Sequence, residues 1–204
     1  MSIAAIILAA GESSRFGAPK QLLTWEKDNL VNTVICTALA AGLSPVVVVL
    51  GAYAGQVQPT INQPVHVVIN TSWAEGVSTS IRAGLEGLPD DVEGVLFLHA
   101  DQPQVSVTLI DAILRLARQR MAIVKPLYLG RPGNPVFFPR ASFEALKTLR
   151  GDAGGRQVMG QFRVLQLEWL DETMGWDADT PQEDRKSTRL NSSHSAKSRM
   201  PSSA

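Results

Sequence analysis

The chain has 204 residues, of which 45% are hydrophobic and 19% are charged, and this composition favours one compact domain over two. Its apolar runs are too short to cross a bilayer, and the first leads into a glycine-rich turn rather than a signal-peptide cleavage site. The single cysteine, Cys36, excludes an intrachain disulfide and fits a reducing compartment. We therefore expect a cytoplasmic protein without a membrane segment.

Residues 184–204 differ in composition from the rest of the chain, because they are rich in Ser, Arg and Lys and have no apolar periodicity. The stretch DRKSTRLNSSH resembles a translated sequencing adapter, and the alternative is a native disordered basic tail. We favour the adapter, and we expect residues 1–183 to form a domain that lacks its native C-terminus. These residues carry 14 Lys and Arg against 18 Asp and Glu, and this acidic balance disfavours nucleic-acid binding.

Strands and helices alternate along the chain. In order, the pattern predicts strand 3–10, helix 29–41, strand 46–50, strand 65–69, helix 78–88, strand 92–98, helix 106–119, strands 123–126 and 134–138, helix 141–149 and strand 162–167. The first strand is apolar on both faces, as in the middle of a parallel sheet. We therefore predict an α/β fold with a single doubly wound, mostly parallel sheet and flanking helices. Ligands of such sheets bind beyond the carboxyl ends of the strands.

A glycine-rich loop follows the first predicted strand, in the sequence LAAGESSRFGAPK. Small residues let a ligand approach the backbone, and successive backbone N–H groups can bind phosphate oxygens. Arg15 suits bidentate contact with a β- or γ-phosphate, and Lys20 suits an α-phosphate. Glycine and two cations fit an ordinary loop with solvated charges equally well. The loop lacks both the GxGxxG pattern of dinucleotide-binding folds and the GxxxxGK[ST] pattern of Walker A loops.

The longer stretch LAAGESSRFGAPKQLL resembles the signature LAxGxSxRfGxxKxLl of the MobA-like nucleotidyltransferases and matches every fixed position, including Ser13. Ala10 and Gln21 resemble the branch of molybdenum cofactor cytidylyltransferases, since the guanylyltransferase branch usually has Gly in place of Ala10. The resemblance spans residues 3–183. It implies a Rossmann-like fold of the nucleotide-diphospho-sugar transferase type. It also implies transfer of a nucleotidyl group from an NTP, CTP for this branch, to the terminal phosphate of molybdopterin.

The resemblance also implies site residues. For nucleotide binding these are Leu8, Ala9, Ala10, Gly11, Ser13, Arg15, Lys20, Asn70, Gly76, Ser80 and Asp101. Arg15, Lys20 and Asp101 are the catalytic candidates among them. The candidates for acceptor binding are Gly133, Asn134, Pro135, Asp152 and Arg156. This chain has Gly155 where the family usually has Ala, and Asn134 where it often has His, so it departs from the family pattern at the predicted acceptor site.

A carboxylate at the end of a predicted strand can hold Mg²⁺, whose remaining ligands are water and phosphates, but an Asp near a proline is usually only a turn former. The place of Asp101 in the family pattern implies the Mg²⁺ role, and we expect it. Asp177 or Asp179 is the candidate for a second ligand, and the alternative is helix capping before Pro181. His99 is two residues before Asp101, so the strand pattern predicts one shared face, and we expect a structural, hydrogen-bonded histidine. Cys36 is expected in the core rather than as a nucleophile.

Other functions stay open at this point. The same fold could serve GTP or a different phosphorylated acceptor. A non-catalytic carrier that delivers the cofactor to a molybdenum-dependent dehydrogenase is the rival from another class, and a catalytic enzyme could also deliver. A Rossmann dehydrogenase is disfavoured, because GxGxxG is absent.

Overall fold

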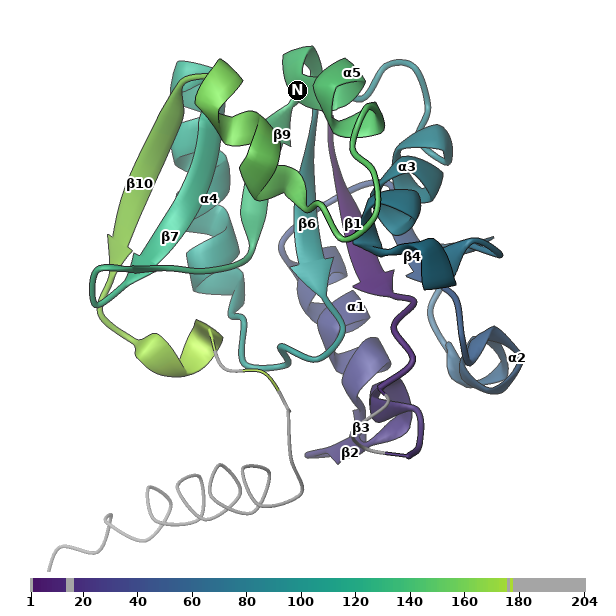
Figure 1. Cartoon of the computed structure of the whole chain (residues 1–204). Helices are drawn as coiled ribbons and strands as arrows, with labels where there is room; N and C mark the ends of the chain where they lie inside the picture. The colour runs from purple at the N-terminus through teal and green to yellow at the C-terminus, as the bar shows by residue number, and fades with distance from the viewer. Residues whose placement is uncertain (1, 14–16, 176, 178–204) are drawn as a thin grey trace, which may run out of the picture.

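The computed structural model describes residues 2–13, 17–175 and 177. Eight strands form one sheet in the order β10-β7-β9-β6-β1-β4-β5, with β8 paired to β7 (Figure 1). In chain order these strands are β1 (Ile3–Ala9), β4 (Val46–Leu50), β5 (His66–Ile69), β6 (Gly94–His99), β7 (Ile123–Tyr128), β8 (Arg131–Pro132), β9 (Val136–Pro139) and β10 (Val164–Trp169). A separate hairpin joins β2 (Thr24–Trp25) to β3 (Asp28–Asn29).

The sheet is mostly parallel, as predicted. β1 pairs in parallel with β4 on one side and β6 on the other, β4 pairs in parallel with β5, and β7 with β10. The antiparallel strand β9 lies between β6 and β7. The periodicity located this strand but could not give its direction, because alternation along a strand is the same in either direction.

Helices cover both faces of the sheet. They are α1 (Leu30–Ala40), α2 (Ala54–Val57), α3 (Val77–Glu86), α4 (Val107–Arg120) and α5 (Phe143–Lys147). α1 and α4 pack on one face, while α3 and α5 pack on the other (Figure 1). Alternate residues of β1 pack into the two cores. Ala5 and Ile7 belong to the core beneath α1 and α4, whereas Ala4 and Ile6 belong to the core beneath α3 and α5. The doubly wound architecture is therefore confirmed.

Helix starts follow capping chemistry. The Asn29 side chain accepts a hydrogen bond from the backbone N–H of Asn32 (2.9 Å), and the Ser106 side chain accepts one from Leu109 (3.2 Å). α3 begins one residue before its predicted start, with Gly76 as its N-cap, so Ser78 lies inside the helix.

The prediction for Cys36 was wrong, because this side chain is exposed on the outer surface of α1. Among the helices of residues 2–13 and 17–175, none is long and apolar enough to cross a bilayer.

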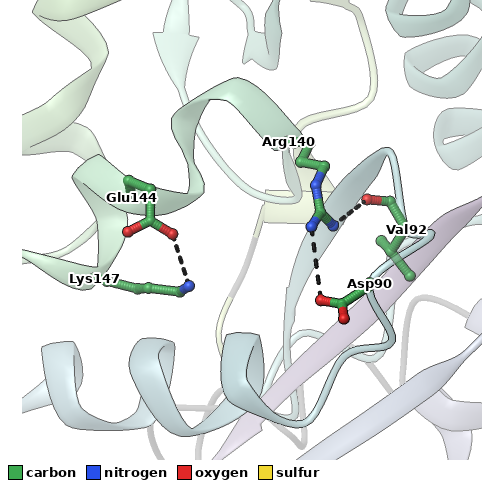
Figure 2. Close-up of polar contacts among 5 residues, drawn as sticks. All are labelled: Asp90, Val92, Arg140, Glu144 and Lys147. Atoms are coloured by element: carbon green, nitrogen blue, oxygen red, sulfur yellow. Dashed lines mark hydrogen bonds and ion pairs between the residues drawn. The ribbon is translucent and has the colours of Figure 1, made fainter.

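Polar contacts of α5 and of the segment before it are shown in Figure 2. Arg140 donates to the backbone oxygen of Val92 (3.0 Å) and forms a longer ion pair with Asp90 (3.8 Å). Lys147 pairs with Glu144 one helical turn away (2.8 Å). Both ion pairs are exposed, so each contributes little to stability.

A substitution at Phe137 tests whether β9 contributes to the core of the sheet. Its side chain is fully buried in the core that α1 and α4 cover. We expect Phe137→Ala to lower the free energy of unfolding by about 3–5 kcal/mol, because it removes a buried ring and leaves a cavity. The measurement is urea unfolding, with Leu170→Ala as a control, since Leu170 is 85% exposed. Equal stability of the two variants would contradict this account of the core.

Candidate functional site

A cavity of about 390 Å³ lies beyond the carboxyl ends of β1 and β6. The predicted nucleotide-binding residues that line it are Leu8, Ala9, Ala10, Gly11, Lys20, Gly76, Ser80 and Asp101. They come from four separate stretches of the chain. The structure therefore brings most of the predicted nucleotide site into one cavity, whose described wall combines small residues with the cation of Lys20 and the carboxylates of Glu12, Asp101 and Asp152.

Gln21 holds the glycine-rich loop against the first turn of the following segment. Its side-chain amide donates to the backbone oxygens of Ala9 (2.9 Å) and Gly11 (3.2 Å). The side chain is buried, and its Oε1 atom has no hydrogen-bond partner among the described residues. Backbone oxygens at the end of a strand would otherwise have to accept hydrogen bonds from water. The Gln21 amide donates to both of these oxygens instead, and so it fixes the loop that lines the cavity. The sequence marked Gln21 only by resemblance to one branch, and its contact with the loop is a finding of the structure.

Gly76 joins two distant parts of the cavity wall. Its φ is +112°, and a Cβ atom built at this position would lie 2.2 Å from the carbonyl carbon of Gly151. The backbone N–H of Ser78 donates to the oxygen of Gly151 (3.1 Å). This close approach brings Asp152 to the first cavity, although we predicted an acceptor-binding role for it. Only glycine fits at position 76 without moving the backbone.

Asn70 supports the wall from behind. It is buried, and its amide donates to the hydroxyls of Thr79 (2.8 Å) and Ser80 (2.9 Å). Its own oxygen accepts from the backbone N–H of Ser72 (3.0 Å). Ser80 lines the cavity, whereas Asn70 is absent from the cavity surface. Its position indicates a positioning role for Asn70 rather than direct contact with a ligand.

The carboxylates that we expected at a metal site lie on neighbouring segments. Asp101 follows the end of β6 and lines the first cavity. The Asp177 carboxylate accepts a hydrogen bond from the buried side chain of Gln102 (2.5 Å), which is adjacent to Asp101 in the chain. Within the described residues, no three His, Cys, Asp or Glu side chains gather closely enough to hold a metal ion. One or two carboxylates with substrate phosphates suit Mg²⁺, so the donor chemistry fits this ion.

A second cavity of about 320 Å³ lies over β6, β9 and β7. The predicted acceptor residues Gly133, Asn134 and Arg156 line it, while Pro135 does not. Most of the remaining wall is apolar, and Lys125 adds a second cation that the sequence analysis did not single out. The cavity therefore suits a largely flat or apolar molecule with negative charge or carbonyl oxygens.

The loop at Gly133 and Asn134 rests on Tyr128. The Tyr128 hydroxyl donates a short hydrogen bond to the backbone oxygen of Asn134. A Cβ atom at position 133 would meet the Tyr128 ring at 2.3 Å, so the ring packs directly on this glycine. Burial of the hydroxyl raises the pKa of Tyr128, and the charge of Asp171 adds to the effect. Tyr128 is therefore neutral at physiological pH and remains a hydrogen-bond donor.

Leu8, Val77 and His99 line both cavities, and the two cavities therefore meet at these residues. β6 ends at His99, so Asp101 lies in the turn after the strand rather than on the predicted shared strand face. The imidazole has no hydrogen bond to other described residues, contrary to our expectation of a hydrogen-bonded structural histidine. Its polar atoms are accessible where molecules in the two cavities would meet.

Some predicted residues do not line either cavity, and others lie outside the described part of the chain. Ser13 has a positive φ of 52° and precedes the undescribed segment 14–16. Arg15 belongs to that segment, and Asp179 also lies outside the described residues. Their predicted roles stay predictions.

Residues 5–167 match the family described as the MobA-like NTP transferase domain. The chain belongs to this family. It is a nucleotidyltransferase of the MobA-like type, as the glycine-rich signature predicted.

Three relatives of known name align with the MobA-like chain over most of its length. Nicotine blue oxidoreductase of Paenarthrobacter nicotinovorans is 31% identical, with 87% of this chain and 92% of the relative covered. Purine catabolism protein PucB of Bacillus subtilis is 30% identical, with the same coverage of 87% and 92%. Molybdenum cofactor cytidylyltransferase of Escherichia coli is 27% identical, with coverage of 88% and 92%. Since these names differ, membership in the family does not decide the substrate.

Solved structures agree with the fold. The protein Rv0371c of Mycobacterium tuberculosis superposes with a TM-score of 0.81 at 26% identity, covering 92% of this chain and 96% of that one. A complex of Rv0371c with manganese superposes with a TM-score of 0.79 at 26% identity, covering 91% and 97%. A nucleotidyl transferase of Methanothermobacter reaches 0.78 at 20% identity, covering 95% and 99%, and this likeness supports the fold alone.

Gly76→Ala tests whether the contact between positions 76 and 151 shapes the MobA-like site. We expect a loss of about 2 kcal/mol or more in the free energy of unfolding, because alanine is strained at this φ and its Cβ meets backbone atoms. Nucleotide affinity should fall as well, since Gly76 and Asp152 line one cavity. Urea unfolding and equilibrium titration with CTP measure the two effects.

The matched control is Gly55→Ala in α2, where an added Cβ meets no atom within 4 Å. This variant should keep its nucleotide affinity and gain up to about 1 kcal/mol of stability. If Gly76→Ala behaved like this control, the contact would have no role in forming the cavity.

Proposed function

We propose that this chain transfers CMP from CTP to the terminal phosphate of molybdopterin and releases pyrophosphate. The observation that carries the proposal is the meeting of two cavities at Leu8, Val77 and His99. The first cavity combines a glycine-rich loop with Lys20 and Asp101, as a triphosphate requires. The second is largely apolar with cationic groups, as a ring system with a phosphate requires.

The reaction needs positioning and charge neutralisation more than covalent help from the protein. In the proposed step, an oxygen of the acceptor phosphate forms a bond with the α-phosphorus of CTP. The bond between that phosphorus and the oxygen bridging to the β-phosphate breaks, and pyrophosphate takes the electron pair. Lys20 stabilises the negative charge on the α-phosphate, and Arg15 is proposed to bind the departing phosphates. The acceptor lies in the second cavity against Asn134 and Arg156.

Asp101 is the proposed Mg²⁺ ligand, with Asp177 beside it through the Gln102 amide. When bound, the ion would neutralise phosphate charge. The manganese complex of Rv0371c supports use of a divalent cation in this family.

The choice of CTP rests on the resemblance of Ala10 and Gln21 to the cytidylyltransferase branch, supported by the relative from Escherichia coli. The test must separate three alternatives. These are use of GTP in place of CTP, transfer to another phosphorylated acceptor, and a carrier role for a molybdenum-dependent dehydrogenase. We also propose a cytoplasmic location, where the nucleotide and a reduced Cys36 would both be found.

An oxidoreductase is the second candidate function. It is favoured by one observation, the 31% identity with nicotine blue oxidoreductase. The first cavity has no GxGxxG loop for a dinucleotide, which weighs against it. Oxidation of a reduced nicotinamide in the presence of nicotine blue, without any added nucleoside triphosphate, would support this candidate.

Pyrophosphate release tests the main proposal. We expect release when the protein, Mg²⁺, molybdopterin and CTP are combined, and at most a small fraction of that rate with GTP. EDTA should stop the release, and added Mg²⁺ should restore it. Binding of CTP without release would direct the search to other phosphorylated acceptors or to a carrier. Faster release with GTP would contradict the interpretation of Ala10.

Lys20→Ala tests the proposed catalytic cation. We expect kcat to fall by about 10²–10³-fold, because a positioned charge that acts on the transition state is removed. Steady-state kinetics with varied CTP measure the change. Lys27→Ala is the matched control, since Lys27 is exposed in the hairpin between β2 and β3 and lines neither cavity. Wild-type turnover by Lys20→Ala would eliminate this role.

A further inference from the structure

Lys125 is a charged residue in the wall of the second cavity. It lies in β7, whose other residues are apolar or aromatic and are buried. Lys125 itself is half-buried, and it lines the cavity beside Phe97 and Val136. A central strand rarely carries a lysine, because half-burial of an ammonium costs solvation free energy. A role for the positive charge in ligand binding would explain why the chain carries this cost in solvation free energy.

The Lys125 ammonium has no hydrogen bond or ion pair with the other described residues. Its strand neighbour in β10 is Gln166, which is exposed and uncharged. The stem of the lysine can pack on the apolar wall while its charged head stays accessible in the cavity. The group is therefore available to a ligand, and the strand beneath it fixes its position.

The strand register gives the distance from this lysine to the point where the cavities meet. Val124 pairs with Phe137, and Val136 pairs with Phe97, so Lys125 lies level with Val136 and Phe97 across three strands. His99 is two residues further along β6, at the junction of the cavities. Two strand spacings and two residue steps separate the Cα atoms of Lys125 and His99 by roughly 12 Å.

We propose that Lys125 is an acceptor-specificity residue that binds a negatively charged or carbonyl oxygen at the end of the acceptor remote from its reacting phosphate. The inference rests on the proposed function, in which the reacting phosphate lies at the junction beside His99. Lys125 then selects acceptors that carry such an oxygen on the side of the molecule away from that phosphate. The apolar side chains between the two points bind the body of the molecule.

Arg156 has a different place in this arrangement. It is exposed and belongs to the short helical segment Gly155–Gln161, whereas Lys125 is half-buried and part of the sheet. Arg156 therefore belongs to the entrance of the cavity. Lys125 belongs to its floor, where a charge contact is less screened by solvent and salt.

The test is equilibrium binding of molybdopterin to the wild-type chain and to Lys125→Met, without nucleotide. Methionine keeps the stem and removes the charge. We expect the dissociation constant for molybdopterin to rise about 10- to 100-fold, as for loss of a charged hydrogen bond, and that for CTP to stay within about twofold. Lys125→Arg, which restores a cation, should recover most of the affinity.

Lys147→Met is the matched control, because Lys147 pairs with Glu144 on the surface and lines neither cavity (Figure 2). It should bind molybdopterin like the wild type. Should Lys125→Met unfold, Lys125→Gln replaces it. Unchanged molybdopterin affinity in a folded Lys125 variant, or no binding by the wild type, would overturn the inference. An equal loss of CTP affinity would also overturn it, since that pattern indicates a merely structural role.

The pyrophosphate assay separates this inference from the proposed function. Binding of molybdopterin that depends on Lys125, without release from CTP or GTP, would support the lysine contact and reject the transfer reaction. Release from CTP with equal KM for molybdopterin in the wild type and Lys125→Met would support the reaction and reject the contact.

Discussion

The reversal of strand order at β1 is the constraint on which the site depends. The chain adds β4 and β5 on one side of β1 and then crosses to add β6 on the other. Loops that leave neighbouring strands at such a point diverge, and the crevice between them is open to ligands. The glycine-rich loop after β1 and Asp101 after β6 therefore line one cavity, although Gly11 and Asp101 are 90 positions apart in the chain.

The antiparallel strand β9 extends this site in the other direction. Because it lies between β6 and β7, the sheet continues past β6 and provides the floor of the second cavity. Pairing of β9 with both neighbours brings Lys125 and Asn134 to the same cavity as His99. The same sheet thus carries both cavities, with Leu8, Val77 and His99 between them.

Two buried glutamines support the first cavity and the segment beside it through side-chain hydrogen bonds. Gln21 donates hydrogen bonds to the backbone oxygens of Ala9 and Gly11, and Gln102, which follows Asp101 in the chain, donates one to the Asp177 carboxylate. Relatives with different names share the MobA-like domain, from nicotine blue oxidoreductase to molybdenum cofactor cytidylyltransferase. In this chain the wall of the second cavity includes Lys125, Asn134 and Gly155.

The sequence by itself determined the elements, the fold class and the family. Strongly apolar or periodic segments such as β1, β4 and α4 could be predicted within one or two residues, because burial on one or both faces leaves a local pattern. The glycine-rich loop and Lys20 could be singled out as candidates because their signature is local and characteristic, and Asp101 because it follows a predicted strand within the family pattern. Short segments such as α2, β2 and β8 were missed, since a few residues carry no periodicity.

Only the tertiary structure decided which distant residues meet. The contact of Gly76 with Gly151 brings Asp152 to the first cavity, and the hydrogen bonds of Asn70 hold its side chain behind the cavity wall. The outward direction of Cys36, the open position of His99 and the place of Lys125 likewise follow from packing between elements. The local sequence indicates which residues favour burial or a turn. The pairing of strands and the approach of loops depend instead on contacts between residues far apart in the chain.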